Sequence, residues 1–268
     1  MKSILVIPAH NVGRTIGEIV TLARKYVSEV LVVDDNSVDK TGEISRACGA
    51  LTVKLQEMDR EARGKGLALR TGFTLALRRG AELVITIDGD GENDPTDVPV
   101  LITTLVGESV DAALGARLET HGSLILGFKP TRIFLEEHFG ILVDDPMSGI
   151  RAYRASVIET ILPKLTSAGF GIDLEIVLQI LLHGFSFTEV SVSARDLVPR
   201  DGLKVQQLEA FCENLFAYRD RFKQAPRLDV FDPQALLKAV SCRDPIRISL
   251  KDRPIELRFN PISQLYEP

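Results

Sequence analysis

The sequence predicts an α/β fold with a mainly parallel, twisted sheet that carries helices on both faces. A C-terminal helix and β-hairpin extend it. Two observations predict this fold. Short apolar runs alternate with amphipathic stretches from residue 3 to residue 114, which is the pattern of repeated β-α-β units. The chain has 268 residues, of which 45% are hydrophobic and 26% charged, and this globular balance excludes disorder, collagen and coiled coil.

Local patterns define the elements of the first half. The segment Arg14–Tyr26 places Ile16, Ile19 and Val20 on one face, as an amphipathic helix does. The other expected helices are Lys40–Cys48, Gly66–Arg79 and Pro95–Leu105. The expected strands are Ser3–Ile7, Glu29–Val33, Leu51–Leu55, Glu82–Ile87 and Asp111–Leu114. Because helices separate these strands, we expect the strands to run parallel.

The second half is less regular, and its composition changes after Pro199. The expected helices are Gly127–Leu142, Ile172–Leu182 and Lys204–Phe222, and Ser186–Val192 alternates like a strand. Two further alternating runs, Ile246–Leu250 and Ile255–Phe259, predict a hairpin. We therefore expect a main domain over residues 1–205 and a C-terminal extension of unknown role over residues 206–268.

Charge and hydropathy limit the classes of partner. The net charge is −5, which excludes a broad cationic surface for nucleic acid. Three widely spaced cysteines indicate reduced thiols rather than a disulfide framework. No apolar stretch reaches the roughly 18 residues of a membrane span. These features predict a cytoplasmic protein, at most peripheral at the cytoplasmic face of the membrane, with the hairpin as a candidate membrane-surface or homodimer contact.

A run of acidic residues, Asp88-Gly89-Asp90-Gly91-Glu92, directly follows the fourth expected strand. Ligands of parallel sheets bind beyond the carboxyl ends of the strands. Three carboxylates at this spacing can converge on one hard cation. A solvated acidic turn before the next helix explains the pattern equally well, with Asp94 as the helix N-cap.

A second polar cluster, Asp34-Asp35-Asn36-Ser37, follows the second expected strand. An acidic residue at such a strand end often binds the ribose or base of a nucleotide. These residues and Asp39 are also typical helix caps. Both roles can hold, with Asp39 as the cap and Asp35 as the ligand-binding residue.

The order of several short motifs resembles family 2 glycosyltransferases, and in particular their branch that acts on dolichyl and other polyprenyl phosphates. The matching blocks run without interruption over residues 2–205, which a chance motif does not do. In order they are Ile7-Pro8-Ala9-His10-Asn11, Val33-Asp34-Asp35-Asn36-Ser37, Gly64-Lys65-Gly66, Asp88-Gly89-Asp90, Gly115-Ala116-Arg117, Asp145-Pro146-Met147-Ser148-Gly149-Ile150-Arg151-Ala152-Tyr153, Thr188-Glu189-Val190 and Pro199-Arg200-Asp201-Gly202-Leu203-Lys204.

The resemblance implies the GT-A nucleotide-diphosphate-sugar fold and a set of site residues. Donor-binding residues would be Pro8, Ala9, Asn11, Asp35, Lys65, Asp88, Gly89 and Asp90. The D-x-D pair Asp88 and Asp90, with Glu92, would hold Mg²⁺ or Mn²⁺. Acceptor phosphate would meet Arg117, Arg132, Arg200 and Lys204, and the first three of these, with Asp145, are the candidate catalytic residues.

The implied activity is metal-dependent, inverting transfer of a hexose from a GDP- or UDP-linked donor to a polyprenyl phosphate. A soluble hydroxyl acceptor is the first alternative, because such an acceptor needs a base and Asp145 is a candidate. A sugar-1-phosphate nucleotidyltransferase is the second alternative, although Pro8-Ala9-His10-Asn11 lacks the Gly-rich, Arg-containing loop expected there. Glu136 and Val12 depart from the residues common in this branch.

Overall fold

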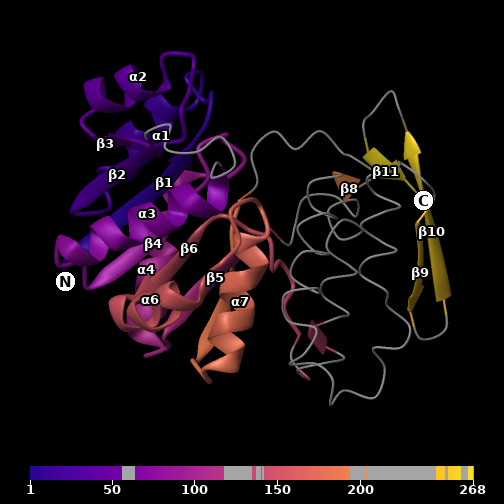
Figure 1. The fold of residues 1–268 in the computed structure, drawn as a ribbon. Helices are drawn as coiled ribbons and strands as arrows, with labels where there is room; N and C mark the ends of the chain where they lie inside the picture. Colours follow the sequence, from indigo (N-terminus) through magenta and orange to yellow (C-terminus); the bar gives the residue numbers. More distant parts are fainter. Residues whose placement is uncertain are drawn as a thin grey trace. The chain divides into compact units, whose positions relative to one another are not determined.

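A computed structural model of the chain describes residues 1–55, 64–117, 135–136, 140, 142–193, 203–204, 246–250, 253–260 and 265–267. The chain divides into two units (Figure 1). The first unit contains Met1–Glu119 and Met147–Leu197, and the second contains Thr120–Pro146 and Val198–Pro268. Among the described residues, no helix is long and apolar enough to cross a membrane.

The first unit is built on a seven-stranded sheet in the order β3-β2-β1-β4-β6-β5-β7. All neighbouring strands run parallel except at β6, which is antiparallel to both β4 and β5. The sequence-based expectation of a mainly parallel sheet is therefore confirmed. The strands are β1 Ser3–Ala9, β2 Glu29–Asp34, β3 Leu51–Lys54, β4 Leu83–Thr86, β5 Ala112–Ala116, β6 Arg151–Arg154 and β7 Phe187–Ser191.

Helices cover both faces of this sheet. On one face, α1 and α4 pack their apolar side chains with alternate residues of the strands, such as Leu5 and Ile7 of β1. On the other face, α3 approaches β1 so closely that a Cβ on Gly72 would lie 2.2 Å from Cγ1 of Val6. The helices are α1 Ile16–Ala23, α2 Thr41–Ala47, α3 Lys65–Arg78, α4 Val98–Gly107, α6 Ala155–Ile161 and α7 Ile172–Leu182, with 3-10 turns η1 Pro95–Asp97 and η2 Leu162–Lys164.

The expected helices and strands of the first unit are present, with ends that differ by a few residues. Strand β6 and helix α6, however, lie where the sequence predicted no element. The first three residues of β6 are buried within the sheet, between β4 and β5, and Tyr153 meets Phe73 of α3 edge-on with ring centroids 6.3 Å apart. The sequence Arg-Ala-Tyr-Arg of β6 is neither an apolar run nor an alternation of apolar and polar residues.

The second unit contains a four-stranded sheet in the order β8-β11-β10-β9. Its strands are β8 Leu203–Lys204, β9 Ile246–Leu250, β10 Arg253–Asn260 and β11 Leu265–Glu267. The antiparallel pairing of β9 and β10 confirms the predicted hairpin. The predicted helices 127–142 and 204–222 lie almost wholly outside the described residues, and the domain boundary at residue 205 stays a prediction.

Candidate active site

A pocket of about 230 Å³ lies in the first unit, beyond the carboxyl ends of β1, β2 and β4. Every predicted donor-binding residue except Asn11 lines it. Parallel strands end at the same edge of a sheet, which brings together segments that are distant in sequence. The lining residues from the predicted set are Pro8, Ala9, Asp35, Lys65, Asp88, Gly89 and Asp90, and the others are His10, Val12, Gly64, Ala68 and Phe170.

Asp35 forms the end of the pocket that follows β2. Its N–H donates to the carbonyl of Ala9 at 2.8 Å, which joins the ends of β1 and β2. Its Oδ2 accepts from the N–H of Gly64 at 2.9 Å. The other carboxylate oxygen, Oδ1, is buried and has no hydrogen-bond partner within the described part of the chain. A buried acceptor without a partner is costly, so this oxygen is available for a donor group of a ligand.

Asn11 supports the pocket rather than lining it. Its backbone is left-handed, with φ of 54°, and its Oδ1 accepts from the N–H of Val38 at 2.9 Å. Its own N–H donates to Oγ of Ser37 at 2.9 Å. These bonds tie the loop after β1 to the loop after β2. Asp39 accepts from the N–H groups of Thr41 and Gly13, but the N-cap position of α2 is Lys40 rather than Asp39.

The acidic loop after β4 concentrates negative charge. Burial, and the charges of Asp88 and Glu92, raise the pKa of Asp90 above its usual value. A divalent cation would relieve this repulsion, and carboxylate oxygens are the ligands that Mg²⁺ and Mn²⁺ prefer. The residues therefore fit the implied metal. Asp94 accepts from the N–H of Thr96 at 2.8 Å, which confirms its role as a cap.

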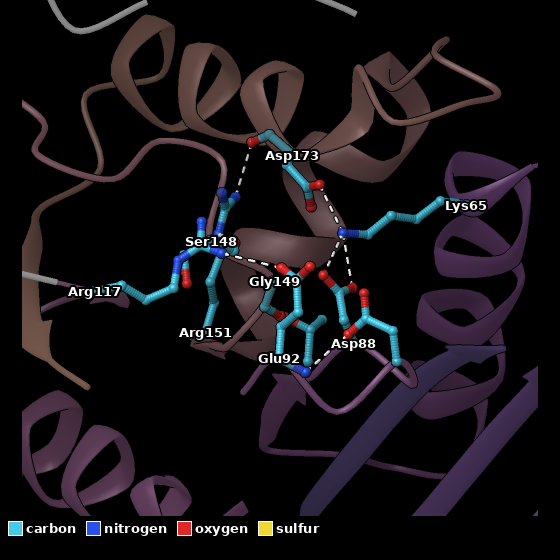
Figure 2. A network of polar contacts seen from close by, with 10 residues as sticks. Lys65, Asp88, Glu92, Arg117, Ser148, Gly149, Arg151 and Asp173 are labelled. Carbon is cyan, nitrogen blue, oxygen red and sulfur yellow. Dashed lines mark hydrogen bonds and ion pairs between the residues drawn. The ribbon is translucent and has the colours of Figure 1, made fainter. Parts of the chain in front are cut away.

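Glu92 faces an arginine and does not line the pocket, unlike the two aspartates. Its Oε2 lies 3.6 Å from Nη1 of Arg117, whose side chain is only 6% exposed (Figure 2). Among the residues that the structure describes, no three His, Cys, Asp or Glu side chains are arranged to hold a metal ion. The three-carboxylate set of Asp88, Asp90 and Glu92 stays a prediction, and Glu92 and Arg117 form an ion pair at the edge of the loop.

Lys65 and Asp173 form the buried side of the site, and the sequence analysis missed Asp173. The Lys65 Nζ lies 2.7 Å from Oδ1 of Asp88 and 2.7 Å from Oδ2 of Asp173 (Figure 2). Burial alone would lower the pKa of Lys65, but the two carboxylates outweigh it and raise that pKa, so the ammonium stays charged. The signal in the sequence was an aspartate inside the apolar run of α7.

A second carboxylate of α7, Glu175, positions the loop beside Lys65. It accepts from the N–H groups of Thr166 and Ser167 at 2.9 Å. That loop lies against the start of α3, where a Cβ on Gly66 would fall 2.1 Å from the carbonyl oxygen of Ser167. This close approach explains why glycine is needed in the Gly64-Lys65-Gly66 motif.

The Ser148-Gly149-Ile150-Arg151 motif contacts both Asp88 and the first turn of α7. The Arg151 Nε donates to the carbonyl of Ser148 at 2.7 Å, and its Nη1 donates to the carbonyl of Asp173 at 2.8 Å. A Cβ on Gly149 would lie 2.1 Å from Oδ2 of Asp88. The motif thus fixes the first turn of α7 and leaves just enough space for the Asp88 carboxylate (Figure 2).

The predicted acceptor residues are only partly described. Arg117 follows β5 in the first unit. Arg132 and Arg200 lie outside the described residues, and Lys204 is described only as part of β8. Asp145 is 4% exposed and belongs to the second unit. The roles expected for these residues stay predictions.

Comparisons with known proteins show the family and the fold of the chain. Residues 4–162 match glycosyl transferase family 2. The chain is 29% identical to a polyprenol monophosphomannose synthase of Mycolicibacterium smegmatis over 72% of this chain and 77% of the relative. It is 27% identical to an undecaprenyl-phosphate mannosyltransferase of Micrococcus luteus over 72% of this chain and 83% of the relative.

A solved structure shares the fold. It is the Mycobacterium tuberculosis glucosyl-3-phosphoglycerate synthase, crystallised with Mn²⁺, uridine diphosphate and glucosyl-3-phosphoglycerate. It has a TM-score of 0.64, is 22% identical in sequence and covers 80% of this chain and 79% of its own. The fold, the pocket and the family match lead to one conclusion: the chain is a glycosyltransferase that belongs to glycosyl transferase family 2.

Proposed function

We propose that this protein transfers a sugar, with inversion, from a nucleotide-diphosphate-sugar to the phosphate of a polyprenyl phosphate, with Mg²⁺ or Mn²⁺ bound at Asp88 and Asp90. The observation that carries the proposal is a pocket lined both by Asp35 and by the aspartates of the acidic loop. The Oδ1 of Asp35, for which the described residues offer no hydrogen-bond partner, suits a ribose or base donor group, and the loop suits a diphosphate-bound cation.

The residues of the chain would divide the work between binding and charge stabilisation. Asp35 would orient the nucleoside, which places the diphosphate next to Asp88, Asp90 and Lys65. When bound, a divalent cation supplies positive charge to the leaving diphosphate oxygens without proton transfer. The pair of aspartates would provide one or two ligands, and diphosphate and water would complete the set, as is usual for Mg²⁺.

A phosphate acceptor fits this chemistry because its oxygen is already anionic and needs no general base. Arginine binds such phosphates in a planar, bidentate geometry. Arg117, Arg132, Arg200 and Lys204 are the candidates for that contact. The two relatives named for polyprenyl-phosphate mannosyl transfer support this acceptor class, and family membership favours glycosyl transfer over nucleotidyl transfer. A lipid acceptor would place the reaction at a membrane surface, with the protein bound peripherally.

Replacing Asp90 tests the donor half of the proposal. We expect Asp90→Ala to weaken Mn²⁺-dependent binding of uridine or guanosine diphosphate by more than about 100-fold, because a metal ligand contributes at least as much as the residues that support it. Binding is measured by calorimetry with Mn²⁺ and with EDTA, and folding by thermal unfolding.

Asp94→Ala is the matched control, since it removes a carboxylate from the same loop. Loss of this cap should cost about 1 kcal/mol of stability and leave the Mn²⁺-dependent binding intact. If Asp90→Ala and the wild-type protein bind nucleotide equally, with or without EDTA, the metal role of the loop is wrong.

Replacing Arg200 tests the acceptor half. We expect Arg200→Ala to slow transfer to a short polyprenyl phosphate by about 10- to 100-fold, the value of a charge-assisted contact. Hydrolysis of the donor, which needs no acceptor phosphate, should be unchanged. Equal losses in the two reactions would argue against the phosphate contact, and efficient transfer to a soluble hydroxyl acceptor would favour Asp145 as a base instead.

A further inference from the structure

We propose that Asp173 is a positioning residue that holds the Lys65 ammonium beside Asp88, where this fixed charge binds the diphosphate of the donor. The inference rests on the proposed function, because it assigns a role within that donor site. It adds to the site a residue that neither binds the expected metal nor lines the pocket.

The geometry of the three side chains supports this role. Lys65 Nζ lies 2.7 Å from an oxygen of each carboxylate, so one ammonium bridges Asp88 and Asp173 (Figure 2). The exposed fractions differ: the side chain of Asp88 is 24% exposed, whereas those of Lys65 and Asp173 are 8% and 6% exposed. Asp88 is therefore the partner that a ligand can approach, and Asp173 is the buried anchor.

Asp173 is itself held in place by the protein. It lies in the first turn of α7, where a negative side chain is favoured by the helix dipole. The guanidinium of Arg151, buried behind the site, donates to the main-chain oxygen of Asp173. Lys65 is the first residue of α3, so the ion pair connects the starts of two helices that are 108 residues apart in sequence.

A lysine needs such an anchor to act as a fixed charge. Its four-carbon stem is flexible, and an unanchored ammonium could pair with Asp88 alone or turn away. With Asp173 as its second partner, the ammonium stays in place when the Asp88 carboxylate interacts with the donor and its cation. A compact ammonium is a common phosphate-binding group in proteins.

Charge balance leads to the same role. The carboxylates of Asp88 and Asp90 both line this edge of the pocket, and Glu92 follows on the same loop. A diphosphate adds further negative charge. Lys65 lines the pocket next to these groups, so holding its charge there lowers the electrostatic cost of bringing the diphosphate in.

A double-mutant cycle between Lys65 and Asp173 tests the proposal. Binding of uridine and guanosine diphosphate, each with Mn²⁺, is measured by calorimetry for wild type, Lys65→Met, Asp173→Asn and the double variant. Thermal unfolding is recorded for each, and binding is measured below all transitions. Asp173→Ser replaces the asparagine variant if the latter does not fold.

We expect Lys65→Met and Asp173→Asn each to weaken nucleotide binding by about tenfold or more. The double variant should bind no more weakly than Lys65→Met alone, because Asp173 acts through the ammonium. Glu29→Gln is the matched control: Glu29 also pairs with two basic side chains, Lys2 and Arg79, but it lies at the start of β2 and does not line the pocket. Its effect should be the same with and without Lys65.

The remaining outcomes overturn the inference. Unchanged nucleotide affinity in Asp173→Asn, or an equal loss from this substitution in the Lys65→Met background, would show that Asp173 does not act through Lys65, while the proposed function would stand. If wild type binds neither nucleotide with Mn²⁺, the proposed donor class fails and the inference fails with it.

Discussion

At the scale of single residues, the site depends on how closely backbone and side chains approach one another. Gly149 is the clearest example, because its Cα faces the carboxylate of Asp88 and a Cβ there would lie 2.1 Å from Oδ2. Asp88 is short and is held by Lys65 on its other side. The carboxylate thus has little freedom to move away from an added methyl group.

Gly149→Ala should therefore displace Asp88 and weaken Mn²⁺-dependent nucleotide binding by about tenfold or more, with the fold retained. Calorimetry measures the affinity and thermal unfolding the fold. Gly169→Ala is the matched control, since an added Cβ there meets no atom of the described residues within 4 Å. Equal affinities of Gly149→Ala and wild type would mean that the position of Asp88 is unimportant for the donor.

At the scale of elements, α3 joins the core to the site. Its first residue, Lys65, carries the ammonium of the site, and its middle packs directly on the sheet through Gly72. The N-terminal end of α3 is also bound by the loop before α7, where the N–H of Gly66 donates to the carbonyl of Ala168 at 2.7 Å. The depth at which α3 packs therefore sets where Lys65 lies.

We expect Gly72→Ala to destabilise the protein, although alanine favours helices. The gain in helix propensity is about 1 kcal/mol, while overpacking costs about 1–3 kcal/mol. A Cβ only 2.2 Å from Cγ1 of Val6 belongs at the high end of that range. The free energy of unfolding in urea should fall by about 1–2 kcal/mol.

Gly107, at the end of α4, provides the control for this prediction. A Cβ there meets nothing within 4 Å, so Gly107→Ala should leave stability unchanged or raise it by up to about 1 kcal/mol. A stabilising effect of Gly72→Ala would show that α3 can move away from the sheet at little cost.

At the scale of the whole molecule, the first unit contains all the residues that line the pocket. The pocket lies where a parallel sheet places its ligands, beyond the carboxyl ends of the strands. The second unit contains its own sheet with the predicted hairpin. By sequence, the proposed acceptor residue Arg117 belongs to the first unit, whereas Arg132, Arg200 and Lys204 belong to the second.

The sequence by itself determined the elements whose signals are local. The apolar runs that became β1, β2 and β4 are continuous and bounded by polar strand ends. Most residues of the predicted donor-binding set line one pocket. A buried parallel strand appears as a short apolar run, and a helix face appears as apolar residues that recur about every 3.6 positions. A single segment displays either signal. The role of Asp94 as a cap was also a local signal, because its partner lies two residues away.

Only the tertiary structure decided the contacts between distant segments. Nothing local indicates that β6 enters antiparallel between β4 and β5, or that Asp173 meets Lys65 across 108 residues. Asn11 shares a motif with Pro8, yet it binds the neighbouring loop instead of lining the pocket. Such contacts depend on strand register and on how loops close over the sheet, and these are properties of the packed chain rather than of any one segment.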